Sequence, residues 1–207
     1  MAKGRVYHWT APARLAHWFH VASLAVLVFT GFYIHSPFLA GGGETMAWMR
    51  FFHFTAMYIF AYGFLVRTLY MCVFTSLIPE CTRILPLPRN LSGIGDVLAY
   101  YLFLKDTHAE YGRYNPLQGL TYFVTGLLIL VMAFTGFAMY GGWLHPEFAW
   151  VNTLLGGLPV TRLVHYLGMW VLVCITAMHI YLVVRQTIVE RDRTLMSMID
   201  GYRQNAE

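Results

Sequence analysis

Four long apolar stretches dominate the chain, near residues 15–36, 49–78, 118–141 and 161–186. Each contains the about 20 mostly apolar residues that a helix needs to cross a bilayer. Segments rich in proline or glycine separate the stretches, and such segments end helices. The pattern predicts an all-α membrane protein, a four-transmembrane-helix bundle that forms one domain over residues 1–207.

Two weaker segments have a different pattern. Residues 91–106 are apolar and aromatic but too short and too weakly apolar for a fifth span. We expect them to form a helix at the inner membrane surface. From Arg185 to the end, charged residues alternate with Ile, Leu and Met. This alternation predicts that the last span continues as an amphipathic cytoplasmic helix.

Composition agrees with a membrane protein, because 58% of the 207 residues are apolar and only 12% are charged. With the N-terminus inside, twelve of the fourteen Lys and Arg residues fall on the inner side. Cytoplasmic loops of membrane proteins carry this excess of positive charge, so both termini are expected in the cytoplasm. The same distribution explains the pI of about 9.0 and argues against nucleic-acid binding. The two outer exceptions are Arg50 and Arg162.

The polar residues that interrupt the apolar stretches follow one motif. An arginine precedes a histidine by three residues at the mouth of three stretches, and a fourth histidine lies within the last. Ionisable side chains are costly in a bilayer and usually mark function. Histidine binds haem iron, and a nearby arginine can bind a haem propionate. The pairs are Arg14 with His17, Arg50 with His53 and Arg162 with His165; the fourth histidine is His179.

Because the spans alternate in direction, each histidine can be assigned a depth. His179 follows His165 by fourteen residues, which is about 21 Å of helix and returns to within about 40° of the same face. We therefore predict two haem groups, with the outer one ligated by His53 and His165 and the inner one by His17 and His179. Arg67 lies fourteen residues after His53, which places it at the inner level as a further propionate partner.

Three alternatives compete with this interpretation. His20 lies one turn from His17, and either ring could face the bundle; His17 is preferred because it completes the Arg-x-x-His spacing and precedes Trp18. A single histidine in a membrane helix more often makes a helix–helix hydrogen bond. A zinc site would need its ligands at one point, whereas these histidines fall at two depths.

At this point the residues resemble a known family. Segments 14–18 with Thr30-Gly31, and 162–170 with His179, are similar to the two signatures of the b-type cytochrome subunit of membrane-bound nickel–iron hydrogenases. Segments 49–54 and 101–104, Asn115-Pro116 and the tail 201–203 are also similar. The His/Arg spacing is shared with cytochrome subunits of respiratory formate dehydrogenases. The Gly-Met-Trp block and the Gly-Tyr-Arg tail favour the hydrogenase family.

The resemblance implies a function and a location. Such subunits sit in the bacterial inner (cytoplasmic) membrane and anchor a hydrogenase whose iron–sulfur small subunit and large subunit face the periplasm. Electrons from hydrogen pass through two b haems to menaquinone or ubiquinone, in a larger oligomeric complex held in lipid. The chain itself would carry no hydrogen-splitting site. A formate dehydrogenase or other periplasmic dehydrogenase subunit, a free-standing diheme cytochrome and a haem-free anchor remain as alternatives.

A quinone site is predicted on the cytoplasmic loop before the third span, because quinone reduction consumes protons and needs polar groups near the inner haem. Some hydrogenase relatives carry a histidine where this chain has Tyr114. The alternative is that the polar run is a solvated loop that caps the third span. The candidate side chains are His108, Tyr114, Asn115 and Gln118.

Overall fold

The structure is a computed structural model that describes residues 5–69, 82, 84–107, 109, 111, 114–141, 145–189 and 193–204. The chain divides into two compact units. The first unit joins residues 1–67 to residues 169–207, and the second contains residues 68–168. Each unit is described by itself below.

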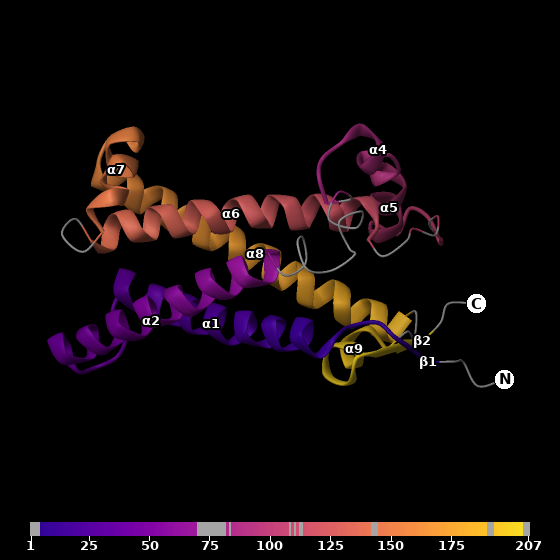
Figure 1. Ribbon diagram of the computed structural model, residues 1–207, viewed down its shortest axis with the longest axis horizontal. Coiled ribbons are helices and arrows are strands. Elements are labelled where there is room, and N and C mark those ends of the chain that lie inside the picture. Colours follow the sequence, from indigo (N-terminus) through magenta and orange to yellow (C-terminus); the bar gives the residue numbers. More distant parts are fainter. Residues whose placement is uncertain are drawn as a thin grey trace. The chain divides into compact units, whose positions relative to one another are not determined.

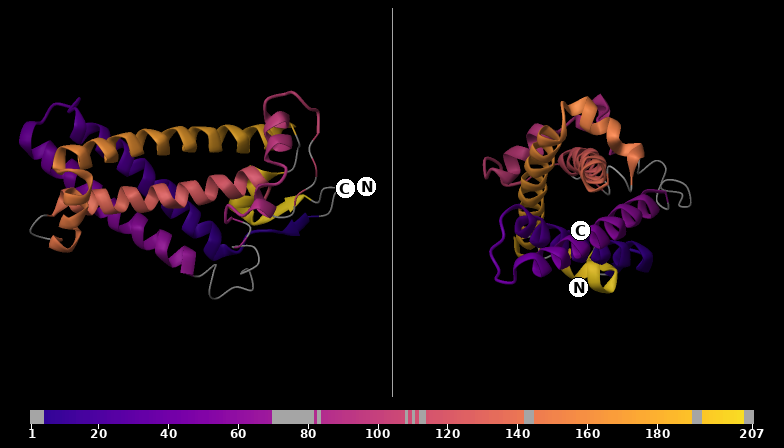
Figure 2. Two further views of the ribbon diagram at one scale, coloured as in Figure 1. Left: turned by 90° about the horizontal axis from the view of Figure 1, so that it is seen from above. Right: turned by 90° about the vertical axis from the view of Figure 1, so that its left-hand side faces the viewer.

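Among the described residues, four helices are long and apolar enough to cross a membrane (Figures 1 and 2). They confirm the prediction of an all-helical membrane protein with four spans. Helix α8 belongs to both units, because the boundary between the units falls at residue 168. The helices are α1 (Ala11–His35), α2 (Gly42–Leu69), α6 (Pro116–Tyr140) and α8 (Leu158–Val189).

The observed helix ends differ from the predicted ones where local backbone chemistry decides. Helix α1 begins four residues earlier than predicted, with a proline in its first turn, where the missing N–H costs nothing. Helix α2 begins seven residues earlier, directly after Gly41, whose φ of 136° makes the turn. Glu44 in its first turn complements the helix dipole. The end predicted for this span, residues 70–78, lies outside the described residues.

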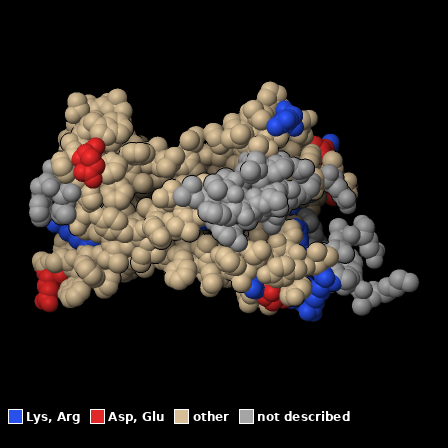
Figure 3. All heavy atoms as spheres, viewed as in Figure 1, with Lys and Arg blue, Asp and Glu red and all other residues tan. Residues whose placement is uncertain are grey.

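Much of the apolar surface of these helices is exposed rather than packed. Phe19 in α1 is 64% exposed and Leu163 in α8 is 54% exposed. Helix α6 has no charged residue along its 25 residues, and Figure 3 shows charged atoms gathered near helix ends rather than along the helices. Apolar side chains left exposed at this density need lipid around them, because soluble proteins rarely expose large apolar patches.

The second unit packs short helices against α6. Helices α4 (Pro88–Leu91) and α5 (Ile94–Tyr101) contact it, as do the 3₁₀ turn η2 (Pro146–Phe148) and α7 (Ala149–Leu155). The single helix predicted over residues 91–106 is therefore wrong in its bounds. The helix stops at Tyr101 because Phe103 has a φ of 61°, a left-handed conformation that ends the helical path.

The C-terminal segment also departs from prediction. Helix α8 does not continue as one amphipathic helix, because Arg193 adopts a left-handed φ of 62° and precedes a separate helix, α9 (Thr194–Asp200). Strand β2 (Tyr202–Gln204) then pairs antiparallel with β1 (Arg5–Tyr7), so both ends of the described chain meet. The Tyr202 backbone N–H, and then Arg193, lower the pKa of the exposed Asp200 carboxyl. Residues 5–7 and 193–204 are called the terminal clasp below.

Gly201 forms the tight turn between α9 and β2 in the terminal clasp. Its carbonyl accepts hydrogen bonds from the backbone N–H groups of His8 and Trp9, at 2.8 and 3.2 Å. Its φ is 89°, and a Cβ atom added to it would lie 2.9 Å from the Trp9 carbonyl oxygen. Only glycine combines this backbone conformation with so close an approach of another backbone segment.

Replacing Gly201 with alanine should therefore loosen the clasp. We expect Gly201→Ala to lower the free energy of unfolding by about 1–3 kcal/mol, the cost of a strained left-handed residue with a backbone clash. Gly43→Ala is the matched control, because nothing lies within 4 Å of a Cβ atom there. Chemical unfolding in detergent, followed by circular dichroism, measures both variants. Equal unfolding curves for the two variants would contradict this role of Gly201.

Candidate haem and quinone sites

In the first unit, α1 and α8 bring two of the predicted ligands together. The imidazole rings of His17 and His179 have their centres 6.4 Å apart, with their planes at 58°. Both residues interrupt otherwise apolar helices, and no hydrogen bond among the described residues joins the two rings. The pair predicted from the depth of each histidine along the alternating spans is thus adjacent in space.

The spacing of this pair fits one metal ion between two imidazoles. A ring nitrogen binds a metal at about 2.0–2.1 Å and the ring centre lies about 1.2 Å beyond that nitrogen, so opposed rings have centres about 6.4 Å apart. The measured separation has this value. Among the described residues, no group of three His, Cys, Asp or Glu side chains converges as a zinc site requires. The donor set therefore fits a haem, whose macrocycle leaves only two axial positions for protein ligands.

Arg67 and His20 surround this pair. Arg67, in the last turn of α2, interacts electrostatically with both His17 and His20. The His20 ring packs edge-on against Phe60, and the space left by Gly63 accommodates it. Nδ1 of His20 lies against the Ala16 carbonyl, while its Nε2 is buried without a hydrogen-bond partner in the described part of the chain. His20 thus faces α2, whereas His17 faces His179.

The first Arg-x-x-His-Trp segment has protein partners that the sequence did not predict. The Arg14 guanidinium donates to the carbonyl of Ile199, and the Trp18 indole N–H donates to the carbonyl of Met198 at 2.9 Å. Carbonyls at a helix C-terminus lack intrahelical partners and attract positive charge. Arg14 and Trp18 therefore hold α9 against α1 on either side of His17. Nε of Arg14 remains buried without a partner among the described residues, which leaves a donor for an anion.

His53 is held in α2 by a residue of α1. Its Nδ1 lies 2.9 Å from the hydroxyl oxygen of Thr30, a side chain that is 2% exposed. A Cβ atom on Gly31 would lie 3.4 Å from the ring of His53, so this glycine lets the ring approach α1 closely. The ring is thereby fixed between two helices of the first unit.

His165 has a corresponding partner within the second unit. Its Nδ1 lies 2.8 Å from the hydroxyl oxygen of Thr135 in α6, another side chain that is 2% exposed. His53 and His165 belong to different units, so their pairing around one haem remains a prediction from the sequence. Arg50 and Arg162, which precede them by three residues, are exposed and make no ion pair within the described residues.

The sequence analysis did not predict that Thr30 and Thr135 contact histidines, although a repeated tetrapeptide could have indicated it. The tetrapeptide Phe-Thr-Gly-Phe occurs at residues 29–32 and again at residues 134–137, and each copy precedes an Arg-x-x-His motif. In both copies the threonine contacts the histidine of the motif that follows. An internal repeat that links a polar residue to each histidine would have identified them.

The structure gives two of the four predicted quinone residues a structural task. The Asn115 side chain accepts the Gln118 backbone N–H at 2.8 Å, and the Gln118 side chain accepts the Asn115 N–H at 3.1 Å. This reciprocal capping box begins α6. The Tyr114 ring packs edge-on against Tyr122, at 5.3 Å between centres. His108 lies outside the described residues.

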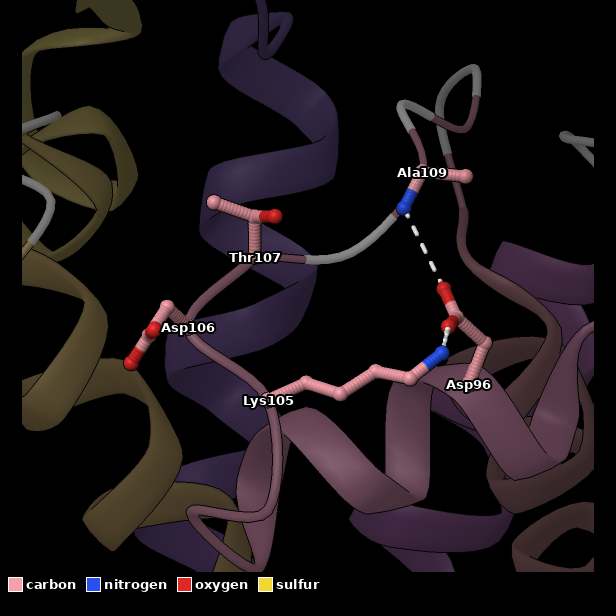
Figure 4. A pocket seen from close by; sticks show the side chains of 5 residues that line it. All are labelled: Asp96, Lys105, Asp106, Thr107 and Ala109. Atoms are coloured by element: carbon pink, nitrogen blue, oxygen red, sulfur yellow. Dashed lines mark hydrogen bonds and ion pairs between the residues drawn. The ribbon is translucent and has the colours of Figure 1, made fainter.

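The loop that leads to this cap is tied to α5. Asp96 forms an ion pair with Lys105 and accepts the backbone N–H of Ala109 at 3.3 Å (Figure 4). These residues, with Asp106 and Thr107, line an open polar hollow. These contacts hold Lys105 and Ala109 beside α5.

Comparison with known proteins gives matches along nearly the whole chain. Residues 8–201 match the family described as prokaryotic cytochrome b561. The chain is 34% identical to a probable Ni/Fe-hydrogenase B-type cytochrome subunit of Cupriavidus necator, covering 95% of this chain and 86% of that protein. The like-named protein of Azotobacter vinelandii is 36% identical, with 96% and 88% covered. The probable Ni/Fe-hydrogenase 1 B-type cytochrome subunit of Escherichia coli K12 is 30% identical, with 95% and 90% covered.

The capping box predicts how Asn115 affects stability. Asn115→Ala removes the acceptor for the first turn of α6 and should cost about 0.5–2 kcal/mol of unfolding free energy. Asn115→Ser retains a capping oxygen and should remain within about 0.5 kcal/mol of the parent chain. Chemical unfolding in detergent compares the three proteins. If alanine and serine at this position were equally stable, the cap would not contribute as described.

Proposed function

The chain belongs to the prokaryotic cytochrome b561 family, and we propose that it is the membrane cytochrome subunit of a nickel–iron hydrogenase. In this proposal it anchors the iron–sulfur small subunit and the large subunit on the periplasmic side of a bacterial inner membrane. It passes electrons through two b haems to the quinone pool. The names of its relatives support the hydrogenase as donor, and the 6.4 Å spacing of His17 and His179 carries the haem assignment.

Four histidines would hold the haems. In this proposal His17 and His179 would hold the iron of the inner haem, and His53 and His165 would hold that of the outer haem. A bound haem supplies a one-electron centre whose potential depends on its axial ligands and on the hydrogen bonds around them. Fourteen residues separate His165 from His179 within the uninterrupted helix α8, so that helix supplies one ligand at each of two depths, about 21 Å apart.

The arginines would balance the propionate charges. Arg67 stands beside His17 in apolar surroundings, where an unpaired cation is costly and an anion would stabilise it. Arg14 has a buried Nε available for the same purpose while its other nitrogen holds α9. We assign the exposed Arg50 and Arg162 either to the propionates of the outer haem or to the protein surface that faces the donor subunit. The chain's own contribution is thus to fix the ligands and to neutralise the carboxylates.

Quinone reduction takes place, in this proposal, on the inner side near α6. Tyr114, Asn115, Gln118 and His108 remain the candidate residues, although the capping box engages Asn115 and Gln118. Of these, Tyr114 and His108 are the better candidates for donating a hydrogen bond or a proton. Protons taken from the inner side, while hydrogen oxidation releases protons outside, would make the overall reaction generate a membrane potential.

The ligand assignment predicts which haem each variant loses. His17→Ala and His179→Ala should remove the same haem, and His53→Ala and His165→Ala should remove the other. Reduced-minus-oxidised spectra and redox titration of each purified variant identify the remaining haem by its midpoint potential. His20→Ala is the control and should retain both haems, because its ring faces Phe60 and Gly63. Loss of one common haem in His53→Ala and His179→Ala would refute the pairing.

The proposed route predicts what hydrogen can reduce. In the purified complex with its hydrogenase subunits, hydrogen should reduce both haems and then a menaquinone analogue. His179→Ala should decrease quinone reduction by at least about 100-fold, since one missing electron carrier interrupts the chain, while hydrogen reduction of an artificial dye should stay unchanged. Stopped-flow spectroscopy follows the haems and the quinone separately. Full quinone turnover without the inner haem would contradict the route.

A further inference from the structure

A neutral imidazole has one ring nitrogen that donates a hydrogen bond and one that carries a lone pair. Only the nitrogen with the lone pair can bind a metal, so the tautomer decides which nitrogen is available. The hydrogen bond made by the other nitrogen sets that tautomer. The contacts of Thr30 and Thr135 with the two Arg-x-x-His histidines therefore have chemical consequences beyond packing.

The proton on the Thr30 hydroxyl can be located from its contacts. The hydroxyl lies 2.6 Å from the Val26 carbonyl oxygen, an acceptor only, so the threonine donates there. A hydroxyl has a single proton. Its 2.9 Å contact with Nδ1 of His53 must then be one in which the imidazole donates and the threonine accepts. The Leu27 carbonyl lies near the same ring as a second acceptor. His53 therefore carries its proton on Nδ1 and its lone pair on Nε2.

The same reasoning applies to Thr135 in the second unit. Its hydroxyl donates to the Val131 carbonyl at 2.7 Å and lies 2.8 Å from Nδ1 of His165. The threonine proton is again committed to its own helix, so His165 donates from Nδ1 and presents Nε2. Two threonines, one in each Phe-Thr-Gly-Phe repeat, thus impose the same tautomer on two histidines.

We propose that Thr30 and Thr135 are positioning residues that fix His53 and His165 as Nε2 ligands of the outer haem and raise the basicity of both rings. The proposal rests on the haem assignment made above. Partners of this kind typically change metal affinity 10–100-fold when removed. By making the imidazoles more electron-rich, both threonines stabilise the oxidised iron and so keep the potential of the outer haem low.

Other threonines show that the histidine contact is what distinguishes this pair. Thr121 in α6 and Thr176 in α8 also donate to the carbonyl four residues earlier, each at 2.8 Å. Bonds of this type are common for threonine in helices. Among the described residues neither of these threonines contacts a histidine, so their mutation removes the same backbone bond without removing a hydrogen bond to a histidine. They are therefore matched controls within the same chain.

The test compares Thr30→Val and Thr135→Val with Thr121→Val and Thr176→Val in the purified complex. Valine keeps the shape of threonine and removes the acceptor. Redox titration should show the midpoint potential of the outer haem raised in Thr30→Val and Thr135→Val, with the inner haem unchanged. The electron paramagnetic resonance signal of the oxidised outer haem should also shift, because it reports how the axial imidazole planes are oriented. Haem retention under mild denaturant should fall about 10–100-fold.

Rescue by serine separates positioning from packing. Thr30→Ser and Thr135→Ser restore the hydroxyl without the methyl group, so potential and resonance signal should return toward those of the parent chain. Unchanged spectra and potentials in both valine variants, in a parent complex that holds two haems, would overturn this proposal and leave the haem assignment intact. A parent complex without haem would instead overturn the proposed function itself. Equal shifts in the control variants would show a general helix effect and also overturn the positioning role.

Discussion

An imidazole buried among apolar helices needs a partner for its N–H and another for its lone pair, because water is not there to supply either. Thr30 and Thr135 meet the first need for His53 and His165, and in the proposed function a haem iron would meet the second. His17 and His179 stand opposite each other at a separation that suits a shared metal ion. Within the first unit α1 supplies the hydroxyl that contacts the ring on α2, and within the second unit α6 supplies the hydroxyl that contacts the ring of His165.

The arginines in the apolar stretches also need partners, because a charged group away from water is costly. A guanidinium beside an apolar stretch requires either a carbonyl or an anion, and Arg14 shows the first of these solutions. One of its nitrogens binds the end of α9 through Ile199, while its buried Nε is left for another partner. The terminal clasp, closed at Gly201, thus connects the C-terminal tail to the turn of α1 that presents His17. A segment distant in sequence from His17 thereby contacts the two residues that flank it in α1, Arg14 and Trp18.

The long helices could be predicted from the sequence, because they depend on repeating patterns of apolar residues. The four spans follow from apolar length, and the approach of His17 to His179 follows from the depths that the alternating direction of the spans assigns to them. The breaks depend on single backbone conformations, which hydropathy does not encode: Phe103 ends α5 and Arg193 separates α9 from α8. The sequence left open whether Asn115 belongs to a quinone site or caps the third span. Two hydrogen bonds show that it caps α6. Thr30 and Thr135 were missed because a threonine in a membrane helix is ordinary until its neighbour is known.

The most direct test of the central claim is a count of haem b per chain in the purified complex, made by extracting the haem and quantifying the polypeptide. A redox titration of the same sample then shows how many components contribute. Two haems per chain that titrate as two components of different potential are the expected result. One haem per chain, or two haems lost together in every single-histidine variant, would contradict ligation at two separate depths.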